Sequence, residues 1–461
     1  MSSNEKVQQR GGFIGAVTNF AYKWIPDAFV IALVLTLVTF LLALAFTDHN
    51  LYALVGDWGK GFWALLEFSM QMALIVVTGY ALATTPFVNR ILVSIARSPK
   101  NATQVYLLGV VATFIAYYIN WGFGLIFAGI FTRELAKQSH FQGIKVDYRL
   151  LVASAYATFM LWHVGLSGSV PLLVATPNHF MVKEMGVIPV THTLFAFQTI
   201  VILIIVVLVT IFLFTKVYPP KPNEVITLAE LHPEYLEKSF VIEEQKLEGD
   251  LTPAQRMTHS KLLAFIIGLA FLVYAYHHFF VLHKSIDINM VNFLMLMLII
   301  FLHKTPARVI QAFKEGTPMA WGIILQFPFY AGIFGIMKYS GLAEVIAKWI
   351  MAITTPSTFP VFVCILSAIL GYFVPSGGAK WAIEAPYIIA AGAQLGVPHA
   401  ATVIAYAFGN DWINLIQPFW ALPFLAVVGL EFREIMGYTA ITFVVLGIFL
   451  LLGLYFVPLA I

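Results

Sequence analysis

The chain has 461 residues, of which 60% are hydrophobic and only 11% are charged, and its mean hydropathy is +0.86. A typical soluble domain has about 25% charged residues, so a soluble fold could not bury this much apolar surface. This composition excludes a soluble enzyme, a nucleic-acid-binding protein and a secreted domain. It predicts an all-α polytopic membrane protein. The single cysteine, Cys364, lies in an apolar run and supports neither a disulfide nor a metal cluster.

Residues 1–27 form a polar to amphipathic N-terminal segment. Phe13, Val17, Phe20 and Trp24 recur on one helical face, which indicates a helix lying on the inner membrane surface. The apolar run that follows is too long and starts too late to be the core of a signal peptide.

Nine later stretches are long and apolar enough to cross a membrane, since a spanning helix needs roughly 20 residues. They are residues 28–47, 60–84, 150–176, 194–215, 261–282, 286–303, 316–338, 400–429 and 435–457. Two more apolar stretches, 104–135 and 359–397, are interrupted by polar and glycine-rich residues. We predict that these two are re-entrant hairpins, which dip to mid-membrane and return.

The positions of Lys and Arg predict the orientation, because cytoplasmic loops carry an excess of both. With the N-terminus in the cytoplasm, 20 of the 26 Lys and Arg residues fall inside, five fall outside, and Lys380 lies beside a hairpin tip. The polar segment 216–260, with 5 basic and 8 acidic residues, is then a cytoplasmic loop, and the C-terminus lies outside.

The predicted elements occur twice in the same order. Residues 28–215 and 286–461 each contain two helices, a hairpin, an interrupted helix and a last helix, and the connecting segment 261–285 inverts the second set. The sequence thus predicts an inverted repeat with two re-entrant hairpins and two interrupted helices. Such repeats are typical of secondary transporters, whose binding site lies near the midplane.

Four segments of non-helical backbone are predicted at membrane depth, at residues 120–124, 165–169, 375–378 and 409–411. Such backbone is tolerated only inside protein or beside a water-filled cavity. Helix N-termini at these breaks favour a carboxylate, whereas carbonyl groups and Asn or Ser side chains favour a small cation. Alternatively, the Gly and Pro residues at these positions only produce packing kinks. This alternative is less favoured because the four breaks occur as two matched pairs.

Four Asp, Glu or Lys residues lie well inside apolar stretches, at Glu67, Lys380, Glu384 and Asp411. Intramembrane charges are costly and usually functional. Lys380 and Glu384 are four residues apart and could form a purely structural pair. Alternatively, Lys380 meets a substrate carboxylate and Glu384 takes a coupling proton. Asp411 could be a cation ligand or a proton carrier.

Enzyme motifs are weak. Residues 165–168 (Gly-Leu-Ser-Gly) match a short pattern of intramembrane serine proteases, which need a histidine base from another helix. No histidine after Ser167 falls in the middle of a predicted span, so a protease is only a remote alternative. His163, two residues before this motif, is interpreted as a hydrogen-bonded packing residue. The chain has no H-E-x-x-H motif and no phosphate-binding loop, so we predict that it is not an enzyme.

Several stretches resemble signatures of the bacterial short-chain fatty acid transporter family, over nearly the whole chain. They are residues 120–125 (Asn-Trp-Gly-Phe-Gly-Leu), 167–173 (Ser-Gly-Ser-Val-Pro-Leu-Leu) with 175–177 (Ala-Thr-Pro), 326–332 (Gln-Phe-Pro-Phe-Tyr-Ala-Gly), 374–378 (Val-Pro-Ser-Gly-Gly) with Trp381, and 417–423 (Gln-Pro-Phe-Trp-Ala-Leu-Pro). The resemblance implies uptake of short monocarboxylates, such as butyrate or acetoacetate, across the bacterial inner membrane. It also implies the paired hairpins and the dimeric, elevator-like architecture of the broader ion-transporter superfamily.

We therefore predict a cation-coupled symporter for short-chain fatty acids. The residues expected to bind the substrate are Asn120, Trp121, Gly122, Ser167, Gly168, Ser169, Ser376, Gly377, Gly378, Lys380, Trp381 and Trp412. The residues expected to bind the coupling ion, Na+ or H+, are Asn120, Glu384, Asn410 and Asp411, with Na+ as a candidate at Asn120 and Asn410. Expected partners are the carboxylate, the lipid bilayer and a second copy in a homodimer, with no nucleic acid and no other cofactor. The runner-up is a transporter of another organic anion, such as a dicarboxylate, which would need a second anchor besides Lys380.

Overall fold

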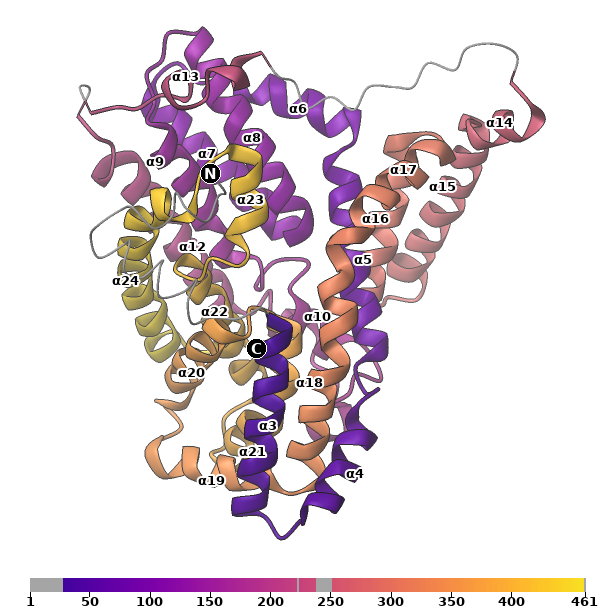
Figure 1. The fold of residues 1–461 in the computed structure, drawn as a ribbon, viewed down its shortest axis with the longest axis vertical. Coiled ribbons are helices and arrows are strands. Elements are labelled where there is room, and N and C mark those ends of the chain that lie inside the picture. The colour runs from indigo at the N-terminus through magenta and orange to yellow at the C-terminus, as the bar shows by residue number, and fades with distance from the viewer. Residues whose placement is uncertain (1–27, 222–223, 238–250, 460–461) are drawn as a thin grey trace.

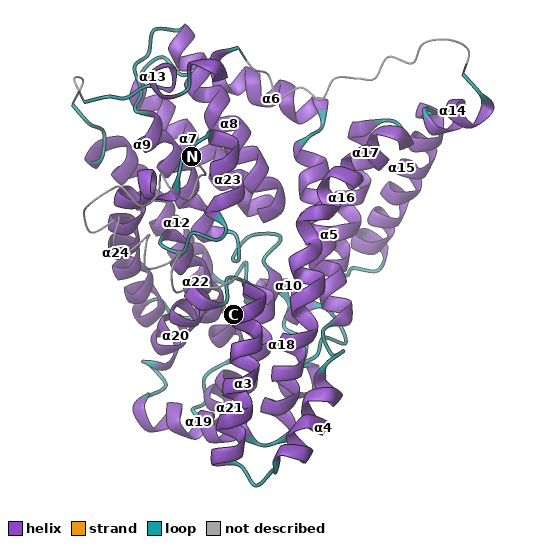
Figure 2. Cartoon of the chain, viewed as in Figure 1, coloured by secondary structure: helices purple, strands orange, loops and turns teal. Residues whose placement is uncertain are grey.

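The computed structural model describes residues 28–221, 224–237 and 251–459. Helices and loops make up this part of the chain, which has no strand (Figure 2). The amphipathic segment predicted at 1–27 lies outside the described residues.

The first half of the chain contains α3 (Ala28–Phe46), α4 (Leu51–Gly61), α5 (Leu66–Ala83), α6 (Pro86–Ala96), α7 (Ala102–Ile119), α8 (Trp121–Phe141), α9 (Tyr148–Ala157), η1 (Thr158–Leu161), α10 (Ser169–Ala175) and α12 (Phe197–Phe212). The second half contains α15 (Lys261–Tyr276), α16 (Ile288–His303), α17 (Pro306–Gly316), α18 (Trp321–Tyr339), α19 (Leu342–Ile353), α20 (Phe359–Phe373), α21 (Gly377–Gln394), α22 (His399–Trp412), η7 (Ile413–Leu415), α23 (Ala421–Val428) and α24 (Phe432–Phe456).

Polar residues fix where several of these helices begin. Asn101 caps α7 by accepting a hydrogen bond from Gln104 N, and Asp147 caps α9 in the same way through Leu150 N, at 2.9 Å. Asp287 caps α16. These side chains satisfy backbone N–H groups that have no acceptor within the helix.

The described residues include seven helices that are long and apolar enough to cross a membrane. Large apolar side chains are exposed along several of them, including Leu41 on α3, Leu208 on α12 and Leu262 on α15, each about 60% exposed or more. Contiguous exposed apolar surface of this extent requires an apolar solvent. The chain is therefore a multi-pass membrane protein, as its composition predicts.

One predicted span, 60–84, begins too early, although α5 within it is long and apolar enough to cross a membrane. Residues 60–84 do not form one helix, because α4 ends at Gly61 and α5 begins at Leu66. Asp57 and Lys60 make α4 amphipathic, and it packs on α18 instead of crossing with α5. The short helices α6, α17 and α19 are also absent from the prediction, because each is too polar or too short to read as a span.

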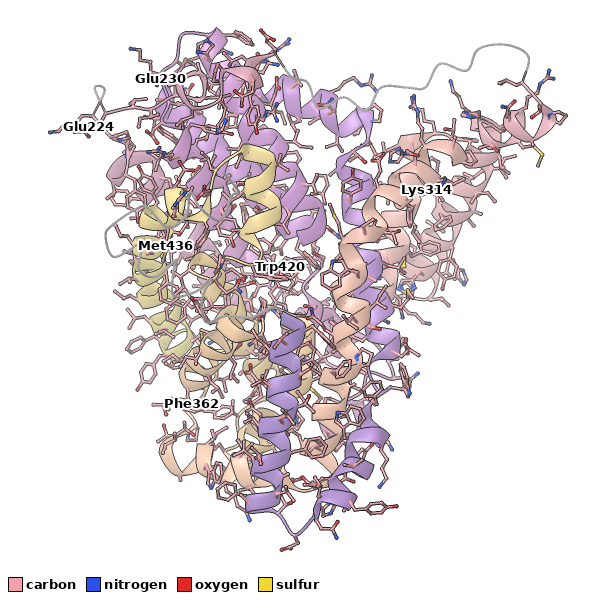
Figure 3. All side chains as sticks on the ribbon, viewed as in Figure 1. Glu224, Glu230, Lys314, Phe362, Trp420 and Met436 are labelled. Carbon is pink, nitrogen blue, oxygen red and sulfur yellow. The ribbon has the colours of Figure 1, made fainter. Side chains whose placement is uncertain are left out.

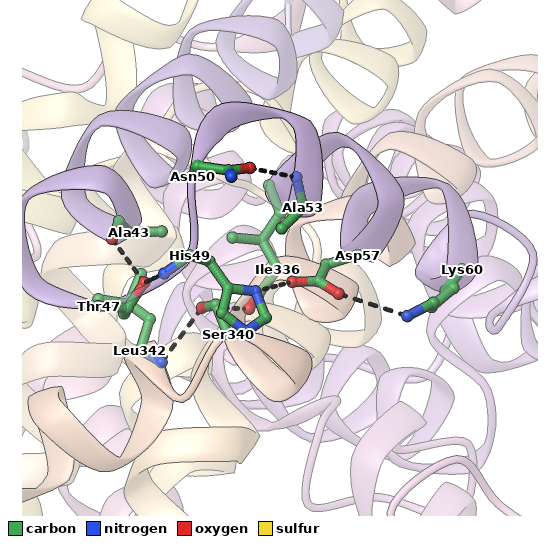
Figure 4. Close-up of polar contacts among 10 residues, drawn as sticks. All are labelled: Ala43, Thr47, His49, Asn50, Ala53, Asp57, Lys60, Ile336, Ser340 and Leu342. Atoms are coloured by element: carbon green, nitrogen blue, oxygen red, sulfur yellow. Dashed lines mark hydrogen bonds and ion pairs between the residues drawn. The ribbon is translucent and has the colours of Figure 1, made fainter.

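A polar cluster holds the turn between α3 and α4 (Figure 4). Asp57, which is buried, accepts from His49 Nδ1 at 2.7 Å and lies 3.7 Å from Lys60 Nζ. Asn50 caps α4 through Ala53 N. Ser340, between α18 and α19, lies beside this turn and accepts from Leu342 N. These contacts hold the turn between α3 and α4 beside the turn between α18 and α19.

The order of elements recurs in the two halves. The series α3 to α8, then the broken helix α9–α10, then α12, corresponds to α16 to α21, then the broken helix α22–α23, then α24. The short helices α4 and α17, and α6 and α19, take matching places.

The helices form two groups (Figure 1). One contains α7, α8, α9, α12, α20, α22, α23 and α24, and the other contains α3, α4, α5, α15, α16, α17 and α18. The groups are joined directly by α5 and α8, and also by α21, which contacts α18 of one group and α20 and α22 of the other. Helices α9, α10 and α22 are buried along nearly their whole length, so the interruptions that follow α9 and α22 lie in the protein core.

Candidate functional site

The first two interruptions of helical backbone lie against each other. Asn120 alone, in extended conformation, separates α7 from α8, and residues 162–168 separate η1 from α10. The Trp121 N–H donates to Ser167 Oγ at 2.9 Å, and the Leu166 N–H donates to the Tyr118 carbonyl at 2.6 Å. Unpaired groups of one break thus satisfy those of the other.

The third and fourth interruptions are joined in the same way. Residues 374–376 separate α20 from α21, and residues 416–420 separate η7 from α23. Trp420 Nε1 donates to the Pro375 carbonyl at 2.6 Å, and the Trp420 ring lies 5.2 Å from that of Trp121. Trp420 lies near the middle of the molecule (Figure 3), so it connects the second pair of breaks to the first.

His163 is the residue on which the first break and α22 meet, and it is fully buried. Its backbone N–H donates to both carboxylate oxygens of Asp411, at 3.0 and 3.2 Å. Its Nε2 accepts from Val170 N at 3.1 Å and lies 3.2 Å from Ser169 Oγ. Its Nδ1 lies 3.2 Å from the side-chain amide of Asn410.

These contacts fix the tautomer of His163. A backbone N–H can only donate, so Nε2 is the acceptor and the proton of the neutral ring sits on Nδ1. The structure places Asn410 Nδ2 at this nitrogen, so the amide has to be turned by 180° for its oxygen to accept from the Nδ1 proton. His163 is therefore neutral here, and it orients both Ser169 and Asn410. We interpreted it from sequence as a packing residue; a lone histidine beside a glycine break is the signal that could have identified it.

The N-terminus of α21 lies directly against His163 and Asn410. A Cβ atom on Gly377 would lie 2.5 Å from His163 Cε1 and 3.0 Å from Asn410 Nδ2. Tyr406 Oη donates to the Gly377 carbonyl at 2.5 Å, and Ser376 caps the helix through Ala379 N. The first N–H groups of a helix have no helical acceptor. Only glycine permits such a close approach of α21 to His163.

Lys380 and Glu384, one turn further along α21, are both fully buried. Lys380 Nζ donates to the Ser367 carbonyl at 2.8 Å and to Ser367 Oγ at 2.5 Å, and it lies 2.9 Å from Glu384 Oε1. The ammonium also lies 4.2 Å from the centre of the Tyr406 ring. Within the described part of the chain, neither carboxylate oxygen of Glu384 makes a hydrogen bond, so the contact of Oε1 with Lys380 is an ion pair and Oε2 has no polar partner.

Five buried side chains near these breaks carry N–H groups that have no acceptor among the described residues. They are Asn120 Nδ2, Trp121 Nε1, Trp162 Nε1, Trp381 Nε1 and Asn414 Nδ2. The rings of Trp121 and Trp162 lie 5.5 Å apart, and that of Trp162 stacks on His163. A buried donor without an acceptor costs about 1–3 kcal/mol. Donors left in this state favour a ligand that brings acceptor oxygens.

The structure places the other predicted site residues as follows. Gly122 follows Trp121 in the first turn of α8, and Gly168 precedes Ser169. Gly378 approaches Phe68 of α5, with 2.7 Å between a Cβ there and Phe68 Cε1. Trp412 points elsewhere: it stacks on Phe443 of α24, and its Nε1 donates to the Phe443 carbonyl at 2.8 Å. It does not join the group around His163.

The break predicted at 409–411 is wrong. Helix α22 continues through Trp412, and irregular backbone begins only after Leu415. Intrahelical bonds satisfy the backbone at Asn410 and Asp411, so these two residues contribute side chains to the site and no free carbonyl groups. The amide of Asn410 is engaged by His163, and Asn120 Oδ1 accepts from Phe123 N at 2.8 Å.

Ser167 is not arranged as a protease nucleophile. Its hydroxyl accepts from the Trp121 N–H, whereas the His163 ring contacts Ser169.

The Tyr406 hydroxyl gives a first testable prediction. Tyr406→Phe removes the donor to the Gly377 carbonyl and should lower the stability of the purified protein by about 1 kcal/mol, because a buried hydrogen bond is lost. Thermal unfolding in detergent measures this change. Tyr455→Phe, at an exposed position on α24, is the control. Equal melting temperatures for both variants would contradict the assigned bond.

Comparison with known proteins places this site in a family. The family described as short chain fatty acid transporter matches residues 12–457. A protein of Escherichia coli K12, named as a candidate short-chain fatty acid transporter, is 39% identical over 438 residues, which are 95% of this chain and 98% of that protein. A protein of the same name from Haemophilus influenzae Rd is 39% identical over 448 residues, with the same shares covered.

Two solved structures share the fold. The YdaH transporter of Alcanivorax borkumensis superposes with a TM-score of 0.59 at 15% identity, covering 94% of this chain and 99% of that one. MtrF of Neisseria gonorrhoeae, described among antimetabolite efflux pumps, gives 0.54 at 13% identity and covers 96% of each chain. These likenesses confirm the all-helical transporter fold. Since the family match spans nearly the whole sequence, the chain is a membrane transporter and not an enzyme, and it belongs to the short-chain fatty acid transporter family.

Proposed function

We propose that this protein is a secondary active, cation-coupled symporter that takes up short-chain monocarboxylates, such as butyrate or acetoacetate, across the bacterial inner membrane. The observation that carries the proposal is the set of buried donors without acceptors at the meeting point of the breaks. A carboxylate supplies acceptor oxygens for such donors, and the N-terminus of α21 adds a favourable dipole. The rings of Trp121 and Trp162 are available to cover a short alkyl chain.

A monocarboxylate suits this site better than a dicarboxylate. A second carboxylate needs a second anchor, and Lys380 is the one Lys or Arg described as contacting this group of residues. Its ammonium already donates to two oxygens of Ser367 and forms an ion pair with Glu384. Transport of another organic anion therefore remains the second candidate.

The moving unit in this proposal is the helix group that carries the breaks. The recurring element order supports an inverted repeat, with α7–α8 and α20–α21 as re-entrant hairpins. The hairpin-bearing group would move against α3 to α5 and α16 to α18 in an elevator-like manner, within a homodimer.

Uptake by purified protein in proteoliposomes tests the proposal. Labelled acetoacetate and butyrate should exchange in a protein-dependent manner, and succinate should compete poorly. Protein-free liposomes correct for passive diffusion of the acids. Efficient succinate exchange without exchange of either monocarboxylate would favour the second candidate.

The orientation is tested by labelling single cysteines. We expect Glu237→Cys, in the polar segment proposed to be cytoplasmic, to resist an impermeant thiol reagent in intact cells and to react in inverted vesicles. Lys60→Cys, at the opposite end, should show the reverse pattern. Both positions are exposed, and the sole native cysteine, Cys364, is buried and gives little background. The opposite pattern at both positions would invert the proposed topology.

A further inference from the structure

Lys380 lies in a coordination shell that resembles the shell of a small bound cation. Its ammonium is surrounded by a carbonyl oxygen and a hydroxyl oxygen of Ser367, a carboxylate oxygen of Glu384 and the face of the Tyr406 ring. Ser367 Oγ can accept from Lys380 because its own proton goes to the Tyr406 carbonyl, at 2.9 Å. These contacts tie α21 to both α20 and α22.

We propose that Lys380 is a resident cation and that Glu384 carries the coupling ion, which is a proton. This inference rests on the proposed function and deepens it. A sodium ion needs several free oxygen ligands, and here the ammonium already holds the oxygens of Ser367 and one oxygen of Glu384. Glu384 Oε2, which is buried and has no partner among the described residues, is the position that an incoming proton takes.

Charge accounting explains how one proton would be coupled to one carboxylate. In the empty carrier, ionised Glu384 neutralises Lys380. When a proton from the outside binds Glu384 Oε2, Lys380 is left uncompensated, and the substrate carboxylate restores the balance. The site therefore has the same charge when it is empty and when it is fully loaded. A carrier with only one of the two ligands holds an extra buried charge, which is strongly disfavoured. In the cytoplasm, Glu384 releases the proton and the carboxylate leaves.

Other titratable groups around the pair are compatible with this cycle. Cys364 on α20, and Asp411 and Tyr406 on α22, interact electrostatically with the pair, as do His163 and Tyr387. Asp411 accepts from the His163 N–H with both of its carboxylate oxygens. His163 is held neutral by its tautomer.

The remaining helices packed on α21 add no competing buried charge. Tyr330 is the buried titratable residue of α18, and Lys338 on the same helix pairs with Glu184 at 2.7 Å, in a partly exposed site. Glu344 and Lys348 of α19 are exposed. Glu384 is the carboxylate that lies 2.9 Å from Lys380 Nζ, so its protonation changes the charge balance of this pair directly.

The experiment uses purified protein in proteoliposomes, with labelled acetoacetate as substrate and protein-free liposomes as the baseline. With choline replacing sodium on both sides, a pH gradient that is alkaline inside should drive accumulation in the wild type. A sodium gradient at equal pH should drive none. Glu384→Gln should keep counterflow exchange, lose accumulation, and exchange substrate independently of pH.

Glu184→Gln, which also removes a carboxylate paired with a lysine, is the matched control and should accumulate substrate normally. Accumulation driven by sodium alone, or accumulation by Glu384→Gln, would overturn the inference and leave the proposed function standing. Absence of any protein-dependent exchange in the wild type would overturn both. If Glu384→Gln fails to insert, the two gradients applied to the wild type still decide whether the coupling ion is a proton.

Discussion

Gly377→Val should abolish carboxylate uptake while the protein still inserts into the membrane. The new Cβ would lie 2.5 Å from His163 Cε1 and 2.9 Å from His163 Nδ1. The ring cannot move aside easily, because both of its nitrogens and the backbone N–H of the residue are hydrogen-bonded. Overpacking of a tightly packed core costs about 1–3 kcal/mol. Here the added side chain would displace the N-terminus of α21 from Asn410 and Ser169.

Uptake of labelled substrate in proteoliposomes measures the loss of transport. Size-exclusion chromatography in detergent shows whether the inserted protein is still folded. Gly378→Val should act similarly, since its Cβ would lie 2.7 Å from the Phe68 ring, across the boundary between the two helix groups. Gly437→Val is the control, because no atom lies within 4 Å of a Cβ at that position in α24. Normal uptake by Gly377→Val would mean that the start of α21 is an ordinary packing kink.

The architecture could be predicted from sequence wherever the signal was a long apolar run. Helices α3, α12, α16 and α24 lie close to the predicted spans, because length and hydropathy alone decide whether a segment can cross a membrane. The amphipathic helices α4, α6, α17 and α19 were missed because they are short and contain polar residues, so none of them gives a long apolar run. Their charged residues, such as Asp57 and Lys60, make them too polar to be recognised in a window of membrane length.

The site was predictable in part. Asparagine, glycine and proline mark the breaks at Asn120 and Pro375 correctly, because these residues end or cap helices locally. At Gly409 the same logic failed: this glycine permits close packing of α22 on α20, where a Cβ would lie 2.1 Å from the Cys364 carbonyl. The hydrogen bonds that His163 makes across the site could not be predicted. Its partners Ser169, Asn410 and Asp411 come from segments about 240 residues apart, and no local pattern encodes that contact.

Lys380→Met and Glu384→Gln should each destabilise the folded protein strongly, and the double variant should recover folding without recovering concentrative uptake. Both side chains are fully buried, so removing one partner leaves an uncompensated charge, or an unpaired polar group, in an apolar site. Breaking such a pair typically costs about 3–5 kcal/mol, whereas replacing both partners by neutral groups is often tolerated. Melting temperatures in detergent should therefore fall in each single variant and return toward the wild-type value in the double variant. Lys380→Met should fall further than Glu384→Gln, because the amide of glutamine can still accept from Lys380 Nζ.

The transport assay separates the structural reading of this pair from the functional one. If the pair only neutralises itself, the double variant regains both folding and accumulation of acetoacetate against a gradient. If Lys380 balances the substrate carboxylate and Glu384 carries the proton, the refolded double variant has neither group and shows, at most, exchange with a raised apparent KM. The partly exposed pair Lys338 and Glu184 provides the reference cycle, in which exposure keeps the loss of stability below about 1 kcal/mol. Recovered accumulation in the Lys380 and Glu384 double variant would remove both residues from the mechanism. The carboxylate would then be held by the helix N-terminus and the buried N–H groups of Asn120, Trp121 and Trp162 alone.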